Sequence, residues 1–378
     1  MPKFIEKQYK SIINKNKIID HWFWTRYSIN PYNGCQFGCI YCDARSDHYH
    51  MPEDFENEIL VKTNVGPMLD QRISRARTFL PDVVGIGGVT DSYQPAEKKF
   101  GNTRAILEVL AKHRYPVHLI TKSTLVLRDL PLLEEIAQQT WCTVSVTITT
   151  TDLEKSILLE KFAPSPAKRL DVLRQIKAEA PHVQTGALLI PLIPVLCDDP
   201  VEVEALFTAV KQTNADYLMF GGAMTLRNRQ ADWFLQQLQH ARPDVYEQYA
   251  GLYEFTPDAR TYDGRYVPAN EYMQAQHKHL FALSQKHQLP HRIKRYIPDD
   301  WRKTNYRIAE RMLNVVFERQ MLGQSWETLF WAAQNIQNLK EPLEAVADRG
   351  ELGRIKNVRG HIKTRIEKIL DEIDREDA

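Results

Sequence analysis

Short apolar or β-branched runs alternate with longer amphipathic stretches from about residue 22 to residue 290. This alternation predicts βα units and a largely parallel sheet, because parallel strands need a crossover connection between them. Right-handed crossovers curl such units into a partial or full barrel. The predicted strands are Trp22–Ile29, Glu58–Thr63, Asp82–Ile86, Val117–Thr121, Cys142–Ile148, Gln184–Ile190 and Tyr217–Phe220.

Helices are predicted between these strands and after the last one. Pro200 directly follows Asp199, which is typical of the first turn of a helix. A turn at residues 262–264 precedes the final helix of the barrel. The predicted barrel helices are Glu97–His113, Leu130–Gln139, Ser165–Glu179, Pro200–Gln212 and Asn270–His287.

Strand signals stop after about Ile297, whereas helical periodicity continues. It runs through Trp301–Met321 and Trp326–Leu339 and ends with a segment near Ile373. We therefore expect two domains. The first is an α/β core at residues 1–297, with an N-terminal extension, and the second is an all-helical domain at residues 298–378.

Composition excludes several classes of protein. Of 378 residues, 43% are hydrophobic and 26% are charged, which is typical of a globular chain that needs no disulfides to fold. The net charge is +1, so any contact with nucleic acid must come from a local basic patch. The N-terminus lacks the apolar segment of a signal peptide, and the longest apolar stretch, residues 187–196, is too short to span a bilayer. We expect a soluble, cytoplasmic protein.

Three of the five cysteines, Cys35, Cys39 and Cys42, form a C-x3-C-x2-C loop directly after a predicted strand. Three thiolates at this spacing can hold three corners of one 4Fe-4S cubane, which leaves the fourth iron open for another ligand. Two alternatives remain at this point. The loop could be a zinc site that recruits His48 or His50, or it could hold three unrelated thiols.

Two motifs make the chain resemble a known family. The segment leading into the loop reads N-P-Y-N-G-C at residues 30–35, and residues 90–97 read T-D-S-Y-Q-P-A-E. Both resemble the spore photoproduct lyase group, the DNA repair photolyase-like branch of the radical S-adenosylmethionine (SAM) superfamily. The resemblance implies a partial (βα)6 barrel that carries the helical domain as an appendage. It also implies a 4Fe-4S cluster and SAM at the carboxyl ends of the strands.

The resemblance also implies the residues that contact SAM. Gly87 and Gly88, with Thr90 and Asp91, would meet the SAM ammonium group, although a plain tight turn is the alternative for the glycines. Lys122, at the end of a strand, would pair with the SAM carboxylate unless it merely extends to solvent.

Two further SAM contacts are implied on the cysteine loop and on the fourth barrel strand. Ser145 would lie near the ribose, with Thr143 as an equally suitable register, because alternation puts both hydroxyls on one face of the strand. Tyr41, between the last two cluster cysteines, would contact the adenine or relay a radical. Packing in the core is the alternative for Tyr41.

The chain departs from the lyases at two positions. Where they have a hydrogen-donating cysteine before the residue matching Thr90, this chain has Val89, and where they have a tyrosine after the last cluster cysteine it has Asp43. Cys142 begins its strand and is expected to be a buried structural thiol. Cys197 follows a strand at the catalytic rim, so we interpret it as a candidate hydrogen donor in catalysis.

The C-terminal segment, residues 330–370, resembles the helix-hairpin-helix module of family X DNA polymerases. In those modules a glycine-bearing hairpin binds a DNA phosphate through backbone N–H groups. Here Asn357 and Arg359 replace the glycines, and arginine tolerates left-handed geometry poorly. The segment is locally basic, and Lys356, Arg359 and Lys363 are the candidate nucleic-acid contacts. A solvated helix pair that closes the barrel is the alternative.

Together these features predict a radical SAM enzyme with a lyase-like reaction on nucleic acid, most simply in DNA repair. An electron donor such as flavodoxin or ferredoxin would reduce the cluster, and no membrane partner is expected. Two alternatives are kept. The radical chemistry could act on RNA, a peptide or a small molecule, or the protein could be a non-catalytic iron-sulfur DNA-binding protein.

Overall fold

The computed structural model describes residues 2–76 and 79–377 and divides the chain into two compact units. The larger unit comprises Met1–Lys15 and Tyr27–Ile293, and the smaller comprises Asn16–Arg26 and Lys294–Ala378. Among the described residues, no helix combines the length and the apolar character needed to cross a membrane.

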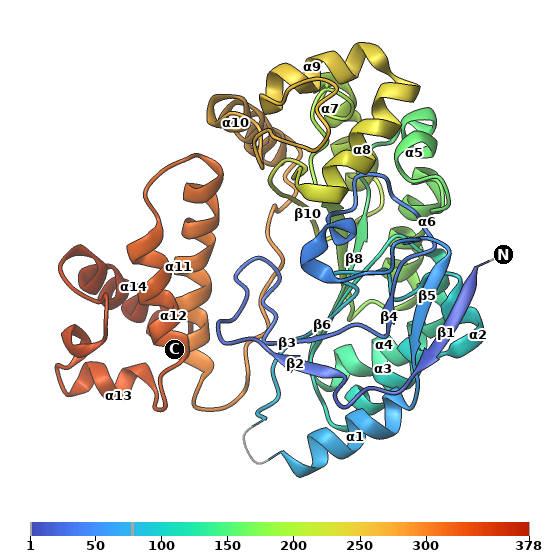
Figure 1. Cartoon of the computed structure of the whole chain (residues 1–378). Helices are drawn as coiled ribbons and strands as arrows, with labels where there is room; N and C mark the ends of the chain where they lie inside the picture. Colours follow the sequence, from blue (N-terminus) through green and yellow to red (C-terminus); the bar gives the residue numbers. More distant parts are fainter. Residues whose placement is uncertain (1, 77–78, 378) are drawn as a thin grey trace. The chain divides into compact units, whose positions relative to one another are not determined.

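The larger unit is built on a curved sheet of seven strands in the order β10-β9-β8-β7-β6-β3-β2. Neighbouring strands from β3 to β10 run parallel, and only β2 is antiparallel. This is the expected partial barrel with six parallel strands (Figure 1). Its strands are β2 (Ile13–Lys15), β3 (Tyr27–Ile29), β6 (Val84–Ile86), β7 (Val117–Thr121), β8 (Cys142–Thr147), β9 (Gln184–Leu189) and β10 (Tyr217–Phe220).

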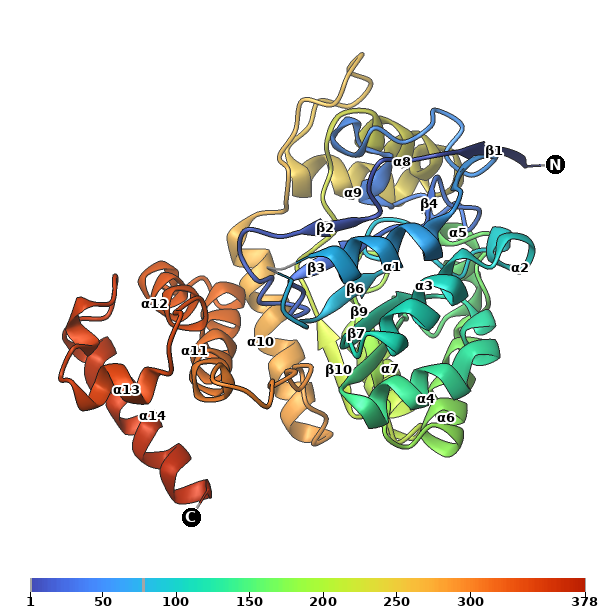
Figure 2. The same cartoon turned by 90° about the horizontal axis from the view of Figure 1, so that it is seen from below.

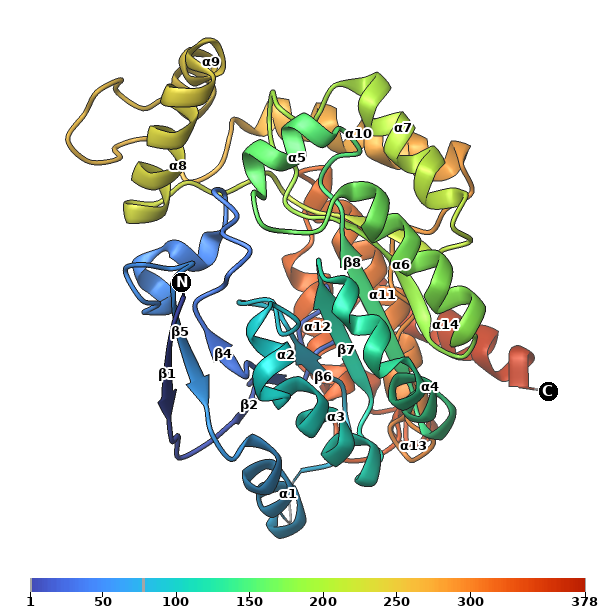
Figure 3. The same ribbon diagram turned by 90° about the vertical axis from the view of Figure 1, so that its right-hand side faces the viewer.

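Amphipathic helices cover the outer face of this sheet, as Figures 2 and 3 show for α3, α4 and α6. The helix predicted over Glu97–His113 is in fact two helices, because Gly101 adopts a left-handed φ of 63° between them. The helices of this unit are α1 (Val65–Arg75), α2 (Ala96–Phe100), α3 (Asn102–Lys112), α4 (Leu130–Gln139), α5 (Leu153–Leu159), α6 (Pro166–Glu179), α7 (Pro200–Lys211), α8 (Asn228–Ala241), α9 (Pro243–Tyr253) and α10 (Asn270–Lys286).

A second, three-stranded sheet corrects one expectation. The strand expected at Glu58–Thr63 is β5 (Glu58–Lys62), but it does not join the barrel. It pairs with β1 (Lys3–Lys7) on one side and with β4 (Tyr32–Asn33) on the other. Alternate β5 side chains are buried and pack beside Tyr32, so this strand has one covered face, unlike β8 and β10, which are buried throughout. The first barrel strand is therefore β3.

The strand expected at Trp22–Ile29 is also too long. Only Tyr27–Ile29 forms a strand, and the preceding residues belong to the smaller unit. There the Trp22 ring lies against Phe317, with centroids 5.2 Å apart, and the Ile19 carbonyl accepts a hydrogen bond from Gln334. The aromatic run in residues 16–26 suits a strand of the core domain, but tertiary packing places these residues in the other unit.

The smaller unit is helical, with a boundary near residue 294 rather than 298. Its apolar core includes Ala332 and Ala333 and the isoleucines of the last helix, all buried. Its helices are α11 (Lys303–Met321), α12 (Glu327–Gln337), α13 (Leu343–Asp348) and α14 (His361–Asp377), with a single 3-10 turn, η4 (Leu352–Arg354), before the last.

Candidate functional site

The cysteine loop follows β4 and wraps tightly. Gly34 has a φ of 84°, and a Cβ there would lie 2.5 Å from the Glu58 carbonyl oxygen, so only glycine fits. The backbone N–H of Cys35 donates to the Phe55 carbonyl at 2.8 Å, and the N–H of Ile40 donates to the Leu159 carbonyl at 3.0 Å. These bonds hold the loop at both ends.

The T-D-S-Y-Q-P-A-E segment supports this loop through its side chains. Gln94 is fully buried; its amide oxygen accepts from the Gln36 N–H and its amide nitrogen donates to the Gly34 carbonyl, both at 3.0 Å. The Thr90 hydroxyl donates to the Tyr32 carbonyl at 2.9 Å. The motif therefore has a structural role that its spacing did not reveal.

The three thiols lie in a largely apolar cluster, with Cys35 and Cys39 buried and Cys42 partly exposed. Burial raises the pKa of Cys39 to about 12, while the positive charge of Lys122 opposes that rise. Burial also raises the pKa of Cys35, and hydrogen bonds from the backbone N–H groups of Asp91 and Phe37 to its sulfur oppose that rise. An iron-sulfur cluster binds thiolates, so a cation and N–H donors at the sulfurs suit one.

The zinc alternative finds no support in the arrangement of side chains. In residues 2–76 and 79–377, no three histidine, cysteine or acidic side chains converge as they would around one metal ion. A cubane offers its irons at separate corners, so its three thiolates need not converge on a single point. Three thiols on one loop suit three corners of a 4Fe-4S cluster.

The two glycines after β6 differ in their surroundings. Gly87 has a φ of 89°, and a Cβ would lie 2.2 Å from the Ile120 carbonyl oxygen, so close packing against β7 explains this glycine. A Cβ on Gly88 would meet nothing within 4 Å. Of the pair, Gly88 borders the open space that a ligand could approach.

Lys122 directly follows β7 at the mouth of the barrel. Its backbone N–H donates to the Asp91 carboxylate at 2.7 Å, and Thr121 donates to the same carboxylate at 2.8 Å. The Asp91 side chain thus positions the end of the strand, which fits a supporting role better than direct contact with SAM. The Lys122 ammonium lies 3.9 Å from Glu160 and 5.6 Å from the centre of the Tyr41 ring, and its side chain is 17% exposed.

Glu160, just beyond α5, is a site residue that no sequence pattern predicted. Its carboxylate accepts hydrogen bonds from the Tyr41 hydroxyl and from the Arg169 guanidinium, and its side chain is fully buried. Arg169 lowers the pKa of Glu160 against the effect of burial, so this carboxylate stays ionised. No motif marks Glu160, because its partners come from other segments of the chain.

Ser145 faces the barrel interior, as alternation predicts, but its hydroxyl is already engaged. It lies 2.7 Å from His118 Nε2 and 2.6 Å from the Tyr217 hydroxyl, and all three residues are fully buried. Thr143 lies 3.2 Å from the same Tyr217 hydroxyl. These contacts form a closed polar layer inside the barrel, so the structure does not favour either hydroxyl for the SAM ribose.

The two remaining cysteines are both buried but lie in different places. Cys142 begins β8 and packs in the core between the sheet and its outer helices. Cys197 follows β9 and packs in the same apolar cluster as Cys35, Cys39 and Tyr41. Burial raises the pKa of the Cys197 thiol well above its usual value, so the sulfur keeps its hydrogen.

The two departures from the lyases are also visible. Val89 packs against the apolar cluster of the cysteine loop and offers no thiol. Asp43 accepts from the Arg227 guanidinium at 2.6 Å and from the Thr225 hydroxyl at 3.1 Å. Asp43 therefore anchors the segment before α8 to the cysteine loop, a role that a tyrosine could not fill with the same ion pair.

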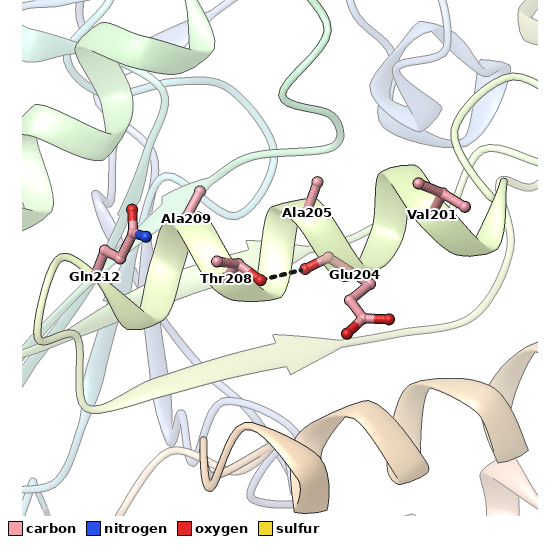
Figure 4. Close-up of a pocket in the computed structure, with 6 residues that line it drawn as sticks. All are labelled: Val201, Glu204, Ala205, Thr208, Ala209 and Gln212. Atoms are coloured by element: carbon pink, nitrogen blue, oxygen red, sulfur yellow. Dashed lines mark hydrogen bonds between the residues drawn. The ribbon is translucent and has the colours of Figure 1, made fainter.

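A groove of about 450 Å³ on α7 is a poor candidate for the site (Figure 4). It is lined by one stripe of this helix, and its only charged side chain, Glu204, already pairs with Lys286. The remaining lining residues are Val201, Ala205, Thr208, Ala209 and Gln212. They offer no group that could act as an acid, base, nucleophile or cluster ligand.

The turn before α14 contains two residues with a positive φ. Asn357 takes the left-handed conformation, with a φ of 67°, and Gly360 does so with a φ of 51°, whereas Arg359 does not have a positive φ. Lys356 and Arg359 are exposed, and in the described part of the chain neither forms an ion pair. Lys363 lies 3.6 Å from Glu367.

Comparison with known proteins agrees with this architecture. The sequence model of the radical SAM superfamily matches residues 29–207. An uncharacterized protein of Mycobacterium tuberculosis is 32% identical over 236 residues, covering 61% of this chain and 68% of that protein. Another, from Methanocaldococcus jannaschii, is 29% identical over 249 residues, covering 65% of this chain and 86% of that protein.

Among solved structures, spore photoproduct lyase complexed with dinucleoside spore photoproduct superposes with a TM-score of 0.56. It covers 75% of this chain and 79% of that one at 14% identity, so the likeness is one of fold. A mutant of the lyase with bound AdoMet and dinucleoside spore photoproduct superposes with a TM-score of 0.52. The match covers 69% of this chain and 74% of that one, at 15% identity.

A parallel partial barrel with a three-cysteine loop at its mouth defines a radical SAM enzyme, whose cofactors are a 4Fe-4S cluster and SAM. The chain belongs to the radical SAM superfamily.

Proposed function

We propose that this enzyme uses SAM-derived radical chemistry on a nucleic-acid substrate, in a lyase-like reaction of DNA repair. The observation that carries the radical assignment is the position of Lys122 beside the thiols of Cys39 and Cys42. Glu160 is the acidic partner of Lys122, and Glu160 also pairs with Arg169. One carboxylate therefore faces two buried cations, which favours binding of a further anion beside Lys122. The SAM carboxylate is an anion of that kind.

The 4Fe-4S cluster and SAM would supply the radical chemistry. A bound 4Fe-4S cluster, reduced by an electron donor, would supply one electron for the cleavage of SAM into methionine and a 5′-deoxyadenosyl radical. The chain's own residues bind and orient these groups. Cys35, Cys39 and Cys42 would hold three irons, Lys122 would hold the SAM carboxylate, and the open space at Gly88 would admit its ammonium group.

Cys197 is our candidate for returning a hydrogen atom to the substrate radical. A thiol serves this role because its S–H bond is weak, and Val89 cannot supply one. The raised pKa of Cys197 supports the assignment, since a donor must keep its hydrogen. Its place in the apolar cluster of the cysteine loop supports it further.

A nucleic-acid substrate is supported by the hairpin of the smaller unit. Left-handed geometry at Asn357 and Gly360 turns the chain tightly before α14, and Lys356 and Arg359 flank that turn without acidic partners among the residues described. Exposed, unpaired cations at a helix N-terminus favour phosphate. The lyase of similar fold is complexed with a dinucleoside photoproduct, which agrees with this substrate class.

The decisive experiment is anaerobic reconstitution with iron, sulfide, SAM and dithionite. We expect release of 5′-deoxyadenosine, and we expect deuterium to appear in it when the correct deuterated substrate is supplied. Ultraviolet-irradiated DNA, undamaged DNA and RNA would be compared as substrates. Cleavage of SAM with no effect of any nucleic acid would contradict the substrate class while leaving the radical chemistry intact.

A further inference from the structure

The Glu160 carboxylate joins four segments of the larger unit. Oε1 accepts from the Tyr41 hydroxyl of the cysteine loop and lies 3.9 Å from the Lys122 ammonium at the end of β7. The Thr149 hydroxyl lies 3.4 Å from the same oxygen. Oε2 accepts from Arg169 of α6. The backbone next to Glu160 supports this arrangement as well, because the Leu159 carbonyl accepts the N–H bond of Ile40.

Anchoring the local fold would not require all of these contacts. The Arg169 guanidinium alone already bonds the Thr147 carbonyl at 2.9 Å and the Pro164 carbonyl at 2.7 Å, besides Glu160. An ion pair between Glu160 and Arg169 would be enough to join α6 to the segment after α5. The carboxylate nevertheless also engages Tyr41 and Lys122, the two side chains that lie against the cluster thiols.

The charges do not cancel at this point. Among these three side chains, Lys122 and Arg169 carry two positive charges against the one negative charge of Glu160, so the group is net positive. All three side chains are at most 17% exposed, so water screens them weakly. A charge at such a place acts strongly on an iron-sulfur cluster, whose reduction adds an electron.

We infer that Glu160 is a positioning residue for the cluster. Its carboxylate holds Tyr41 and Lys122 against the cysteine loop and reduces the positive charge that the cluster experiences, so Glu160 keeps the reduction potential low. A low potential makes the reduced cluster a stronger donor of its electron. The inference rests on the proposed placement of the cluster on Cys35, Cys39 and Cys42.

The test is Glu160→Gln in the full-length, reconstituted protein, with the midpoint potential measured by a redox titration followed by electron paramagnetic resonance. Glutamine has a similar size, keeps one acceptor oxygen for Tyr41 and removes the negative charge. We expect the potential to shift in the positive direction, and Lys122→Met, which removes a positive charge, to shift it in the negative direction. Glu204→Gln on α7 is the matched control and should leave the potential unchanged.

An unchanged potential in a folded, cluster-loaded Glu160→Gln protein overturns the inference. If that variant does not fold because Arg169 has lost its carboxylate partner, the same charge is removed in an Arg169→Gln background. There, adding Glu160→Gln should again shift the potential in the positive direction, and no shift overturns the inference. Neither measurement needs a substrate, so failure here is distinct from failure of the proposed nucleic-acid chemistry.

Discussion

The side-chain amide of Gln94 donates a hydrogen bond to the carbonyl of Gly34, one residue before the first cluster cysteine. The same amide group accepts from Gln36 on the other side of that cysteine. One buried side chain thus spans the start of the cysteine loop from a segment nearly 60 residues away in sequence.

Replacing Gln94 with Ala should therefore loosen the loop. The buried Gly34 carbonyl and the partly buried Gln36 N–H lose their partner, which costs about 2 kcal/mol of unfolding free energy. We expect a lower denaturation midpoint and less iron bound after reconstitution. Gln138→Ala, which removes an exposed side chain on α4, is the control and should change neither. Full iron content in Gln94→Ala would show that the loop holds its shape alone.

Replacing Cys35, Cys39 and Cys42 together with Ala should leave a folded but colourless protein, because the loop lies outside the core between the sheet and its helices. Circular dichroism would check the fold, and iron analysis with visible absorption would check the cluster. Cys142→Ala should keep the cluster, since the Cys142 thiol packs between the sheet and its outer helices, away from the cysteine loop. A triple variant that still binds four irons would refute the assignment of the ligands.

Lys122→Ala should weaken SAM binding while the cluster stays in place. Removing this charge-assisted interaction corresponds to about tenfold or more in affinity. Calorimetry on the reconstituted protein would measure it. Lys177→Ala, whose ammonium pairs with Asp216 at the other end of the barrel strands, is the control. Equal affinity in the Lys122 variant would remove the lysine from the SAM site.

The hairpin is best tested by charge removal rather than by truncation, because residues 16–26 pack into the same helical unit and would be exposed by a deletion. Lys356→Ala, Arg359→Ala and Lys363→Ala together should weaken DNA binding. The log-log salt slope should fall by about 0.9 for each DNA phosphate that the variant no longer neutralises. Lys340→Ala in the same unit is the control. A slope equal to that of the parent would leave the hairpin with a structural role.

Cys197→Ala should change how the substrate radical is quenched. We expect hydrogen return from a solvent-exchangeable site to disappear and the products to change, with little change in cleavage of SAM. Deuterium incorporation from heavy water, read by mass spectrometry, would measure this. Cys142→Ala again provides the control. The same products and the same incorporation in both variants would exclude Cys197 as the donor.

Local patterns in the sequence were enough to predict the parallel barrel, its strands and the cysteine loop. A run as short and as rich in β-branched residues as Val117–Thr121 favours a buried strand over a helix, and three cysteines within eight residues are a local signal. The same holds for the helical end of the chain and for the basic character of its hairpin. In each case the information lies within a few residues of the feature itself.

Only the tertiary structure decided which long-range partners these patterns meet. The strand at residues 58–62 reads like a barrel strand, but its neighbours β1 and β4 place it in a second sheet. The Ser145 side chain points into the barrel, as strand alternation predicts, but its hydroxyl is already hydrogen-bonded to His118 and Tyr217. Glu160 carries no sequence signal at all, because a buried carboxylate acquires its role from the charges that folding brings around it.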